Sequence, residues 1–160
     1  MTVAFCNYVR FKARDGQYQA GRDFQNFFVG ESRTRGDVNY LFAPFGVTPG
    51  AGTKGGDRSD SALIAPATPL AFSLFLEASQ QRWLCEITVA LLDPQTFDEL
   101  VQITTETWIC SRVEAAISNP DRVVLRLSSP LDAVDGQVPR RTLSSALVGS
   151  LPSSGNLTAA

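Results

Sequence analysis

Alternation of apolar and polar residues predicts a β-strand over residues 122–128. Val123, Leu125 and Leu127 share one side of this segment, and a period of two is typical of a strand with one buried face. Ser129-Pro130 ends the pattern, because proline has no N–H to donate to a sheet. The chain beyond it, with the turn pair Asp135-Gly136, is predicted to be a long contact loop.

The same alternation predicts strands in much of the preceding chain. Residues 1–30 read as β-structure with spaced aromatic residues, whereas residues 31–37 read as a charged loop. The remaining predicted strands are 38–47, in which Pro44 marks an edge, 62–65, 83–92 and 100–113. In the segment 83–92, one side is predicted to carry Trp83, Cys85, Ile87, Val89 and Leu91.

A different period predicts one helix over residues 68–81. Thr68 is a suitable N-cap and Pro69 suits the first helical position. Five apolar residues follow at helical spacing, namely Leu70, Ala71, Leu74, Phe75 and Ala78. Phe72 and Leu76 widen this apolar stripe, so we expect the sheet to cover the helix on more than one side.

Several strands, one helix and then three strands in sequence indicate a mainly β fold. We predict a β-sandwich or barrel with one packed α-helix, since no helix separates the last strands. Residues 1–141 are predicted to form a single domain, followed by a C-terminal arm at 142–160. The arm is too apolar for a solvated tail, and it docks either on its own domain or on a neighbouring subunit.

Four glycines and a proline make residues 48–61 a low-complexity segment. It is either a linker between domains or a loop inserted in a hairpin. We expect an inserted loop, because neither flank is large enough to be an independent all-β domain.

Composition and charge narrow the classes of function. The 160 residues are 44% hydrophobic and 19% charged, which suits one globular domain with a real core. A net charge of −2 argues against a bulk electrostatic grip on nucleic acid or on anionic lipid. No apolar run reaches the roughly 20 residues that span a bilayer. The first residues lack the basic and apolar regions of a signal peptide, so we expect none.

The sequence contains few of the side chains that commonly act in catalysis or bind metals. The sequence has no histidine, which excludes Ser-His-Asp triads, Cys-His dyads and histidine zinc sites. Cys6, Cys85 and Cys110 have no metal-like spacing. Cys85 and Cys110 fall in apolar strands, so we expect buried thiols.

Two short motifs have ordinary explanations. Residues 50–55 match GxGxxG, but no helix follows to receive a phosphate, so the glycines fit a flexible loop. Arg35-Gly36-Asp37 matches an adhesion tripeptide, and Gly-Asp is also common turn chemistry.

Charged groups give two further candidates. Asp93, Asp98 and Glu99 could form a carboxylate group for acid–base chemistry or a hard cation, although acids after a strand more often form a turn and a helix start. Arg140-Arg141 could bind a partner protein, bind nucleic acid or be solvated. In an acidic chain we favour the partner protein.

Three segments together resemble a known family. They are Trp108-Ile-Cys-Ser-Arg-Val-Glu, Val123-Val-Leu-Arg-Leu-Ser-Ser-Pro-Leu-Asp-Ala and Gln137-Val-Pro-Arg-Arg. In this order they resemble the amino-terminal domain of the minor tail protein L family of lambda-like phages. The resemblance implies a tail-tube-like β fold and a role in the tail tip or baseplate. The family's cysteine-rich extension, which holds an iron–sulfur cluster, does not follow here, so we expect no metal and no cofactor.

These observations predict a non-enzymatic structural protein of a phage tail tip or baseplate. It would be made in the host cytoplasm and located in the virion tail, as a symmetric ring of several copies among other tail proteins, without nucleic acid or membrane as partners. The predicted contact residues lie in 48–61 and 132–151, and they are Lys54, Arg58, Asp132, Asp135, Arg140, Arg141, Leu147 and Leu151.

Two rival functions remain. A carbohydrate-binding β-sandwich, such as a fibre or adhesin attachment domain, would need aromatic rings exposed on one face, and Trp83 and Trp108 instead suit a core. A hydrolase without histidine would need two carboxylates, for which Asp93 and Glu106 are the candidates.

Overall fold

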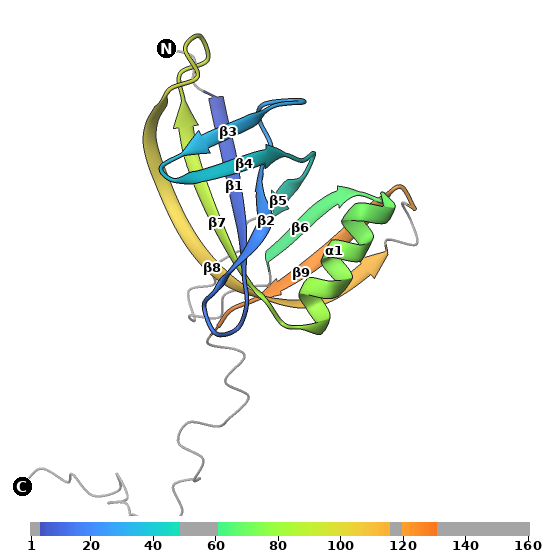
Figure 1. Cartoon of the computed structure of the whole chain (residues 1–160). Coiled ribbons are helices and arrows are strands. Elements are labelled where there is room, and N and C mark those ends of the chain that lie inside the picture. The colour runs from blue at the N-terminus through green and yellow to red at the C-terminus, as the bar shows by residue number, and fades with distance from the viewer. Residues whose placement is uncertain (1–3, 49–60, 116–119, 131–160) are drawn as a thin grey trace, which may run out of the picture.

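Nine strands in one sheet and a single helix make up the described part of the chain (Figure 1). The computed structural model describes residues 4–48, 61–115 and 120–130. The elements are β1 (Ala4–Lys12), β2 (Tyr18–Gln25), β3 (Ser32–Arg35), β4 (Val38–Phe42), β5 (Gly46–Thr48), β6 (Ser61–Pro66), α1 (Pro69–Gln80), β7 (Leu84–Leu92), β8 (Glu99–Ala115) and β9 (Arg122–Ser128). The prediction of a mainly β fold with one helix is confirmed.

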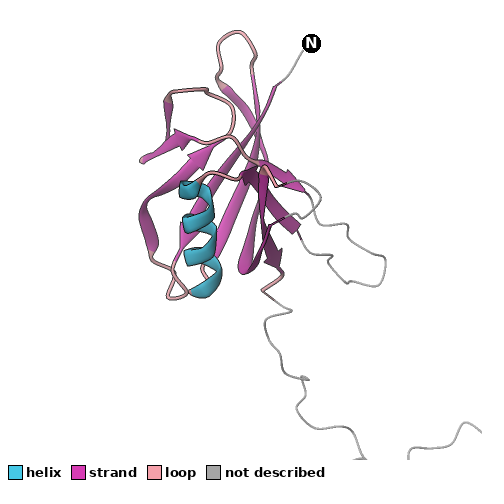
Figure 2. Cartoon of the chain, turned by 90° about the vertical axis from the view of Figure 1, so that its right-hand side faces the viewer, coloured by secondary structure: helices cyan, strands magenta, loops and turns pink. Residues whose placement is uncertain are grey.

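The sheet is open, mixed and strongly curved. Its strand order is β3-β4-β2-β1-β7-β8-β9-β6-β5. The pairing of β2 with β4 is parallel, and the other pairings are antiparallel. Figure 1 shows the β3–β4 hairpin crossing over β1 and β7, while Figure 2 shows α1 against the curved sheet. The curvature lets one sheet enclose side chains without a second sheet.

Two apolar cores lie on opposite faces of this sheet. The helix-side core contains Val9, Phe11, Leu63, Ala65, Leu74, Phe75, Ala78, Trp83, Cys85, Ile87, Trp108, Cys110, Val123, Leu125 and Leu127. The hairpin-side core contains Cys6, Tyr8, Tyr40, Ala90 and Leu92. Strand β1 contributes Val9 and Phe11 to the first and Cys6 and Tyr8 to the second. Because neighbouring residues of a strand point to opposite faces, a single strand can supply both cores.

The predicted alternation in the last strand is confirmed. Val123, Leu125 and Leu127 of β9 are fully buried. In β7 the predicted alternation continues, but the more buried face changes midway. Cys85 and Ile87 are buried in the helix-side core, whereas Ala90 and Leu92 are buried in the hairpin-side core. The buried face changes because the hairpin-side core covers the opposite face of the sheet there.

Helix α1 begins as predicted. Thr68 is the N-cap, and its Oγ1 accepts a hydrogen bond of 3.2 Å from the Ala71 N–H, with Pro69 following in the first turn. The buried residues are Leu74, Phe75 and Ala78. The expectation that sheet covers the helix on more than one side is wrong, because Phe72 and Leu76 are exposed. No helix in the described residues has the length and hydrophobicity needed to cross a membrane.

Two local boundaries differ from the prediction. Residues 31–37 were expected to be a charged loop, yet they contain β3, which pairs with β4 through a turn at Gly36-Asp37. The predicted strand 38–47 is two strands, β4 and β5, which the segment around Pro44 separates. Pairing with β4 therefore makes a strand of the charged segment at 32–35. Pro44 has no N–H to donate to a sheet, so it interrupts the predicted strand 38–47.

A buried glutamine organises the turn after β2. The Gln25 side chain is fully buried. Its Oε1 accepts hydrogen bonds from the N–H groups of Phe27 and Phe28, at 2.6 and 2.7 Å. Its Nε2 donates to the carbonyl oxygens of Phe28 and Glu31, at 3.0 and 3.2 Å. One amide thus satisfies four backbone groups of an irregular segment, as burial of such groups requires.

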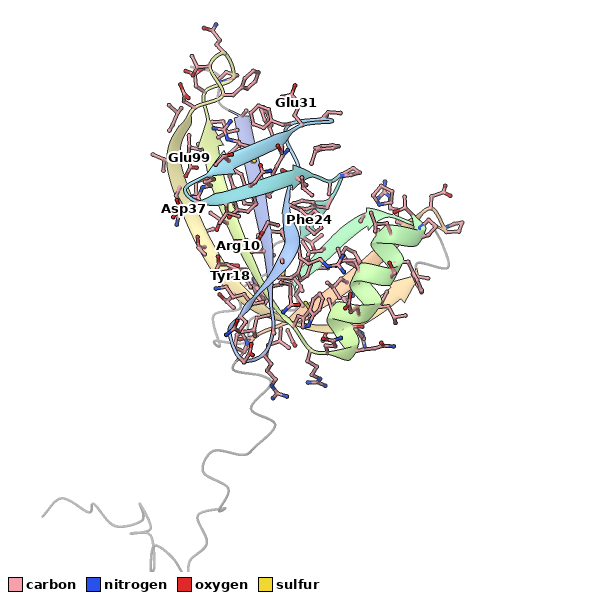
Figure 3. All side chains as sticks on the ribbon, in the orientation of Figure 1. Arg10, Tyr18, Phe24, Glu31, Asp37 and Glu99 are labelled. Carbon is pink, nitrogen blue, oxygen red and sulfur yellow. The ribbon has the colours of Figure 1, made fainter. Side chains whose placement is uncertain are left out.

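An ion pair joins the β3–β4 hairpin to β8. Arg35 donates from Nε and Nη2 to the two carboxylate oxygens of Glu99, at 2.7 and 2.9 Å. Arg35 also donates to Gln102 Oε1 at 2.7 Å. Figure 3 shows Glu99 on the same side of the molecule as Asp37, which forms the hairpin turn. The hydrogen bonds from Arg35 lower the pKa of Glu99 below its usual value and raise that of Arg35.

This ion pair predicts a pH-dependent stability. Since the pKa of Glu99 is lowered in the folded state, its stabilising effect is present above the usual value of 4.5 and is lost as pH falls through the lower folded value. We expect Glu99→Gln to lower the free energy of unfolding by about 1 kcal/mol at pH 7. Urea unfolding of both proteins at several pH values measures the difference.

The difference between the two proteins should shrink as pH falls from 7 to about 3, because protonated Glu99 resembles the glutamine amide in charge. Glu31→Gln, at an exposed position, serves as the control and should leave the pH profile unchanged. A Glu99→Gln effect that is constant over this pH range would argue against the ion pair.

Candidate functional site

An apolar groove lies between α1, the segment after β4 and the inner face of β1 and β2. Its volume is about 400 Å³, within the range of ligand pockets. Its lining residues are Val9, Phe11, Gly21, Arg22, Phe24, Leu41, Phe42, Ala43, Pro44, Phe45, Leu63, Ala65, Pro66, Thr68, Leu70, Ala71, Leu74 and Phe75. Phe24, labelled in Figure 3, lies in β2 on the side of the sheet that the groove opens to.

The groove lies where β4 ends and α1 begins. Pro44 separates β4 from β5, so residues 43–45 form a wall that no strand continues. The helix begins at Pro69, so Leu70 lies at its exposed first turn and is 71% exposed. Leu41 on the opposite wall is 45% exposed. Apolar side chains at both rims therefore remain in contact with water.

The groove carries little charge. Arg22 is the ionisable residue among the lining side chains of the described chain, and its Nη2 lies 3.2 Å from Glu77 Oε2. Both members of this pair are about a third or more exposed, so the pair is worth little in stability. Since its single cation is already paired, the groove suits an uncharged apolar occupant.

A second apolar surface crosses three strands at the far end of the sheet. Phe5 of β1 pairs with Leu91 of β7, and Leu91 pairs with Val101 of β8. Residues paired in this way point to the same face. Phe5 is 60% and Val101 54% exposed. We call these three residues the apolar row.

The apolar row lies on the helix-side face, beyond the part that α1 covers. In β1, Phe5 has the same parity as Val9 and Phe11, which pack in the helix-side core. The helix contacts β8 and β9 rather than the outer end of β1. Ile103, at an irregularity in β8, adds a further exposed apolar side chain nearby. Large apolar residues grouped on a sheet face are typical of protein contacts.

A layer of paired charges covers the lower part of the other face. Arg10 Nε donates to Asp23 Oδ1 at 2.8 Å, and its guanidinium lies 3.5 Å from the centre of the Tyr18 ring. Lys12 pairs with Glu86 and lies over the same ring. Figure 3 shows Arg10 and Tyr18 together in this region. Because both cations already have carboxylate partners, they are better suited to stabilising the fold than to binding an anion.

The acidic residues considered from the sequence are held in separate local contacts. Glu99 is held by Arg35, and Asp93 Oδ1 accepts hydrogen bonds from the Gln95 and Thr96 N–H groups at 2.7 and 3.2 Å. These acids form a turn and the start of β8, so the expected helix start is wrong. Within the described ranges, no cluster of three metal-ligating side chains occurs. Glu106, the other carboxylate considered for a hydrolase, is exposed.

The three cysteines are free and fully buried, as expected for Cys85 and Cys110. Burial raises the pKa of the Cys6 and Cys85 thiols. A buried thiol with a raised pKa is a poor nucleophile. These side chains therefore act as small apolar residues of the two cores.

Both tryptophans are also buried, Trp83 at 3% and Trp108 at 4% exposure. Neither ring is available to stack on a sugar, as the sequence pattern indicated. The arginine of the Arg35-Gly36-Asp37 tripeptide is held by Glu99, and Gly36-Asp37 forms the hairpin turn between β3 and β4.

The described part of the chain does not include the predicted contact residues. They all lie outside the described residues: Lys54, Arg58, Asp132, Asp135, Arg140, Arg141, Leu147 and Leu151. The GxGxxG match at 50–55 lies there too. The two apolar surfaces were missed from the sequence. Phe5, Leu91 and Val101 are far apart in the chain, and only their strand register makes them neighbours.

Comparisons with known proteins leave the family open. No protein-family model and no curated protein matches the sequence. Among solved structures, the chain is similar to one described as the crystal structure of Hcp protein, with 12% sequence identity and a TM-score of 0.35. The alignment covers 79% of this chain and 88% of that chain. Similarity at this level assigns neither a family nor a function.

Proposed function

We propose that this chain is a structural component of a bacteriophage tail tip or baseplate, which assembles by protein–protein contacts. The assignment to a tail is supported by the resemblance of residues 108–114, 123–133 and 137–141 to minor tail protein L. The proposed location is the virion tail after synthesis in the host cytoplasm. The proposed task is contact between subunits rather than catalysis.

The observation that carries this proposal is the apolar row. Phe5, Leu91 and Val101 place apolar side chains side by side across three hydrogen-bonded strands, and Phe5 and Val101 are more than half exposed. An apolar surface held by hydrogen-bonded strands loses little conformational entropy when a neighbour covers it. In a free monomer, an exposed apolar patch of this kind is unfavourable, because it promotes non-specific association.

The open sheet supplies further contact groups. Strands β3 and β5 lie at its two ends, so each has backbone groups directed away from the sheet. β3 carries arginines at alternate positions, which discourages uncontrolled pairing, whereas β5 consists of Gly46, Val47 and Thr48. In a symmetric ring, modest contacts of this kind repeat around the axis and together stabilise the assembly.

A charge in the apolar row should prevent assembly without harming the fold. We expect Val101→Asp to weaken self-association at least about tenfold, since a buried unpaired carboxylate costs well over 1.4 kcal/mol. Val29→Asp adds the same charge at a position that is 78% exposed and outside the row, so it should assemble normally. Native mass spectrometry and light scattering over a range of concentrations measure the association.

Localisation tests the tail assignment separately. An antibody against the chain should label the tail end of phage particles in electron micrographs. A chain that stays monomeric at high concentration and is found in no particle would overturn the structural role. Assembly into rings that never occur in particles would retain the contact surface and reject the phage tail.

A further inference from the structure

The apolar groove is shaped to receive a segment of chain. Its two rims, Leu41 on β4 and Leu70 at the start of α1, are 45% and 71% exposed. Between them, Phe24, Phe45 and Leu74 form an apolar floor and walls. Apolar surface left open to water is unfavourable by roughly 25 cal/mol per Å². An occupant that covers both rims would remove this cost.

The sequence after the described residues supplies a matching occupant. Residues 142–160 contain no charged side chain. Within them, Leu143, Leu147 and Leu151 recur at every fourth position, and Val148 adds a fourth large apolar residue. The groove's single cation, Arg22, is paired with Glu77. An uncharged groove and an uncharged, leucine-rich segment of the same chain are therefore complementary.

The connection is long enough for the segment to reach the groove of its own domain. The described chain ends at Pro130, so the residues between it and Leu143 span up to about 40 Å when extended. A compact domain of about 130 residues has a radius of gyration of about 14 Å. Because the segment is tethered, its effective concentration at the groove is on the order of millimolar.

We propose that the groove formed by α1, β2 and residues 41–45 binds residues 143–151 of the same chain. The leucines fill the space between Leu41 and Leu70, and the groove-lining side of the first turn of α1 becomes buried. This inference is independent of the proposed function, because it concerns the isolated chain and a different surface from the apolar row.

Thiol labelling of the full-length chain tests the proposal. The three native cysteines are buried, so they give little background with an uncharged maleimide. Leu41→Cys places a thiol at the groove rim, and Phe72→Cys places one on α1 outside the groove lining. Leu41 and Phe72 are equally exposed, each at 45%. Dividing each rate by the rate of the same variant in urea removes differences in intrinsic reactivity.

We expect Leu41→Cys to react about tenfold more slowly than Phe72→Cys, as for a groove that is about 90% occupied. Adding Leu147→Asp should raise the Leu41→Cys rate to that of Phe72→Cys and leave Phe72→Cys unchanged. Ser153→Asp adds the same charge outside the segment and should have no effect. These rates should not depend on protein concentration.

Three results would overturn the proposal. Equal rates for Leu41→Cys and Phe72→Cys would show an open groove. Protection that persists with Leu147→Asp would show a different occupant, such as a small apolar molecule. Protection that disappears on dilution would assign the segment to a second copy rather than to the same chain.

Discussion

Trp83→Ala is expected to lower the free energy of unfolding by about 3–5 kcal/mol, the range for removing a large buried aromatic side chain. Trp83 is 3% exposed and its ring centre lies 6.2 Å from that of Phe11. Its Nε1 donates to Gln81 Oε1 at 3.0 Å. The ring therefore joins the end of α1 to β1, and alanine would leave a cavity at this junction.

The backbone at Trp83 should not compensate for this loss. The Trp83 N–H donates to the Ala78 carbonyl at 2.9 Å, and the Trp83 carbonyl accepts from the Cys110 N–H at 2.8 Å. These bonds hold the chain in place, so neighbouring side chains can collapse into the cavity only in part. Most domains are stable by about 5–15 kcal/mol, so the loss amounts to roughly a fifth or more of the total.

Urea unfolding followed by circular dichroism measures the change. Phe72→Ala is the control, because Phe72 is an aromatic residue of α1, the helix that precedes Trp83, but is 45% exposed, and it should cost less than about 1 kcal/mol. A loss below about 1 kcal/mol for Trp83→Ala would show that Trp83 does not hold the helix to the sheet.

Gln25→Leu is expected to destabilise the fold by about 3 kcal/mol, since unsatisfied buried polar groups cost about 1–3 kcal/mol each and water can reach some of them. Leucine has a similar size but can neither accept from the Phe27 and Phe28 N–H groups nor donate to the Phe28 and Glu31 carbonyls. The result separates hydrogen bonding from packing, because the volume at the position changes little.

A second variant tests the two hydrogen bonds that the Gln25 side chain donates. Gln25→Glu keeps an acceptor for the N–H groups, but its ionised form directs a negative oxygen at two carbonyls. Burial and the carbonyls should raise the pKa of the new carboxyl. Its protonated form can donate, so this variant should gain stability relative to the parent protein as pH falls from 7 to about 4.

Thermal and urea unfolding at both pH values measures these effects, with Gln95→Leu as the control at an exposed position. If Gln25→Leu is as stable as Gln95→Leu, the four hydrogen bonds contribute nothing net. If Gln25→Glu shows no pH dependence, the carboxyl is solvated and the turn after β2 opens.

The parts of the fold that could be predicted are those with a local cause. Val123, Leu125 and Leu127 alternate in sequence and are buried in the structure, because a strand's period is fixed by its backbone. The helix could be predicted at its N-terminus, because Thr68 and Pro69 are specific to a helix start.

The parts that could not be predicted depend on contacts between distant residues. Strand β3 carries charges that suggested a loop, and its place is set by pairing with β4 and by the contact of Arg35 with Glu99. The parallel pairing of β2 with β4 and the crossing of the hairpin have no local signal. The groove is likewise formed where α1, β2 and residues 41–45 meet.

The candidate contact residues stand out in the sequence by their charge or by their place in long polar or apolar segments. They lie outside the described residues, so their role stays a prediction. The described surfaces instead offer neutral apolar contacts at Phe5, Leu91 and Val101. Sequence reasoning placed such residues in a generic strand, because it could not say which end of the sheet the helix leaves uncovered.

The sharing of β1 and β7 between two cores limits how this protein can change in length. Tyr8 and Val9 are adjacent, yet one faces the hairpin-side core and the other the helix-side core. One residue inserted midway along β1 would turn the side chains beyond the insertion to the opposite face of the sheet. One of the two cores would then lose the residues that β1 supplies to it. Insertions and deletions can therefore be tolerated in the turns, whereas the central strands must keep their number of residues while side chains within them vary.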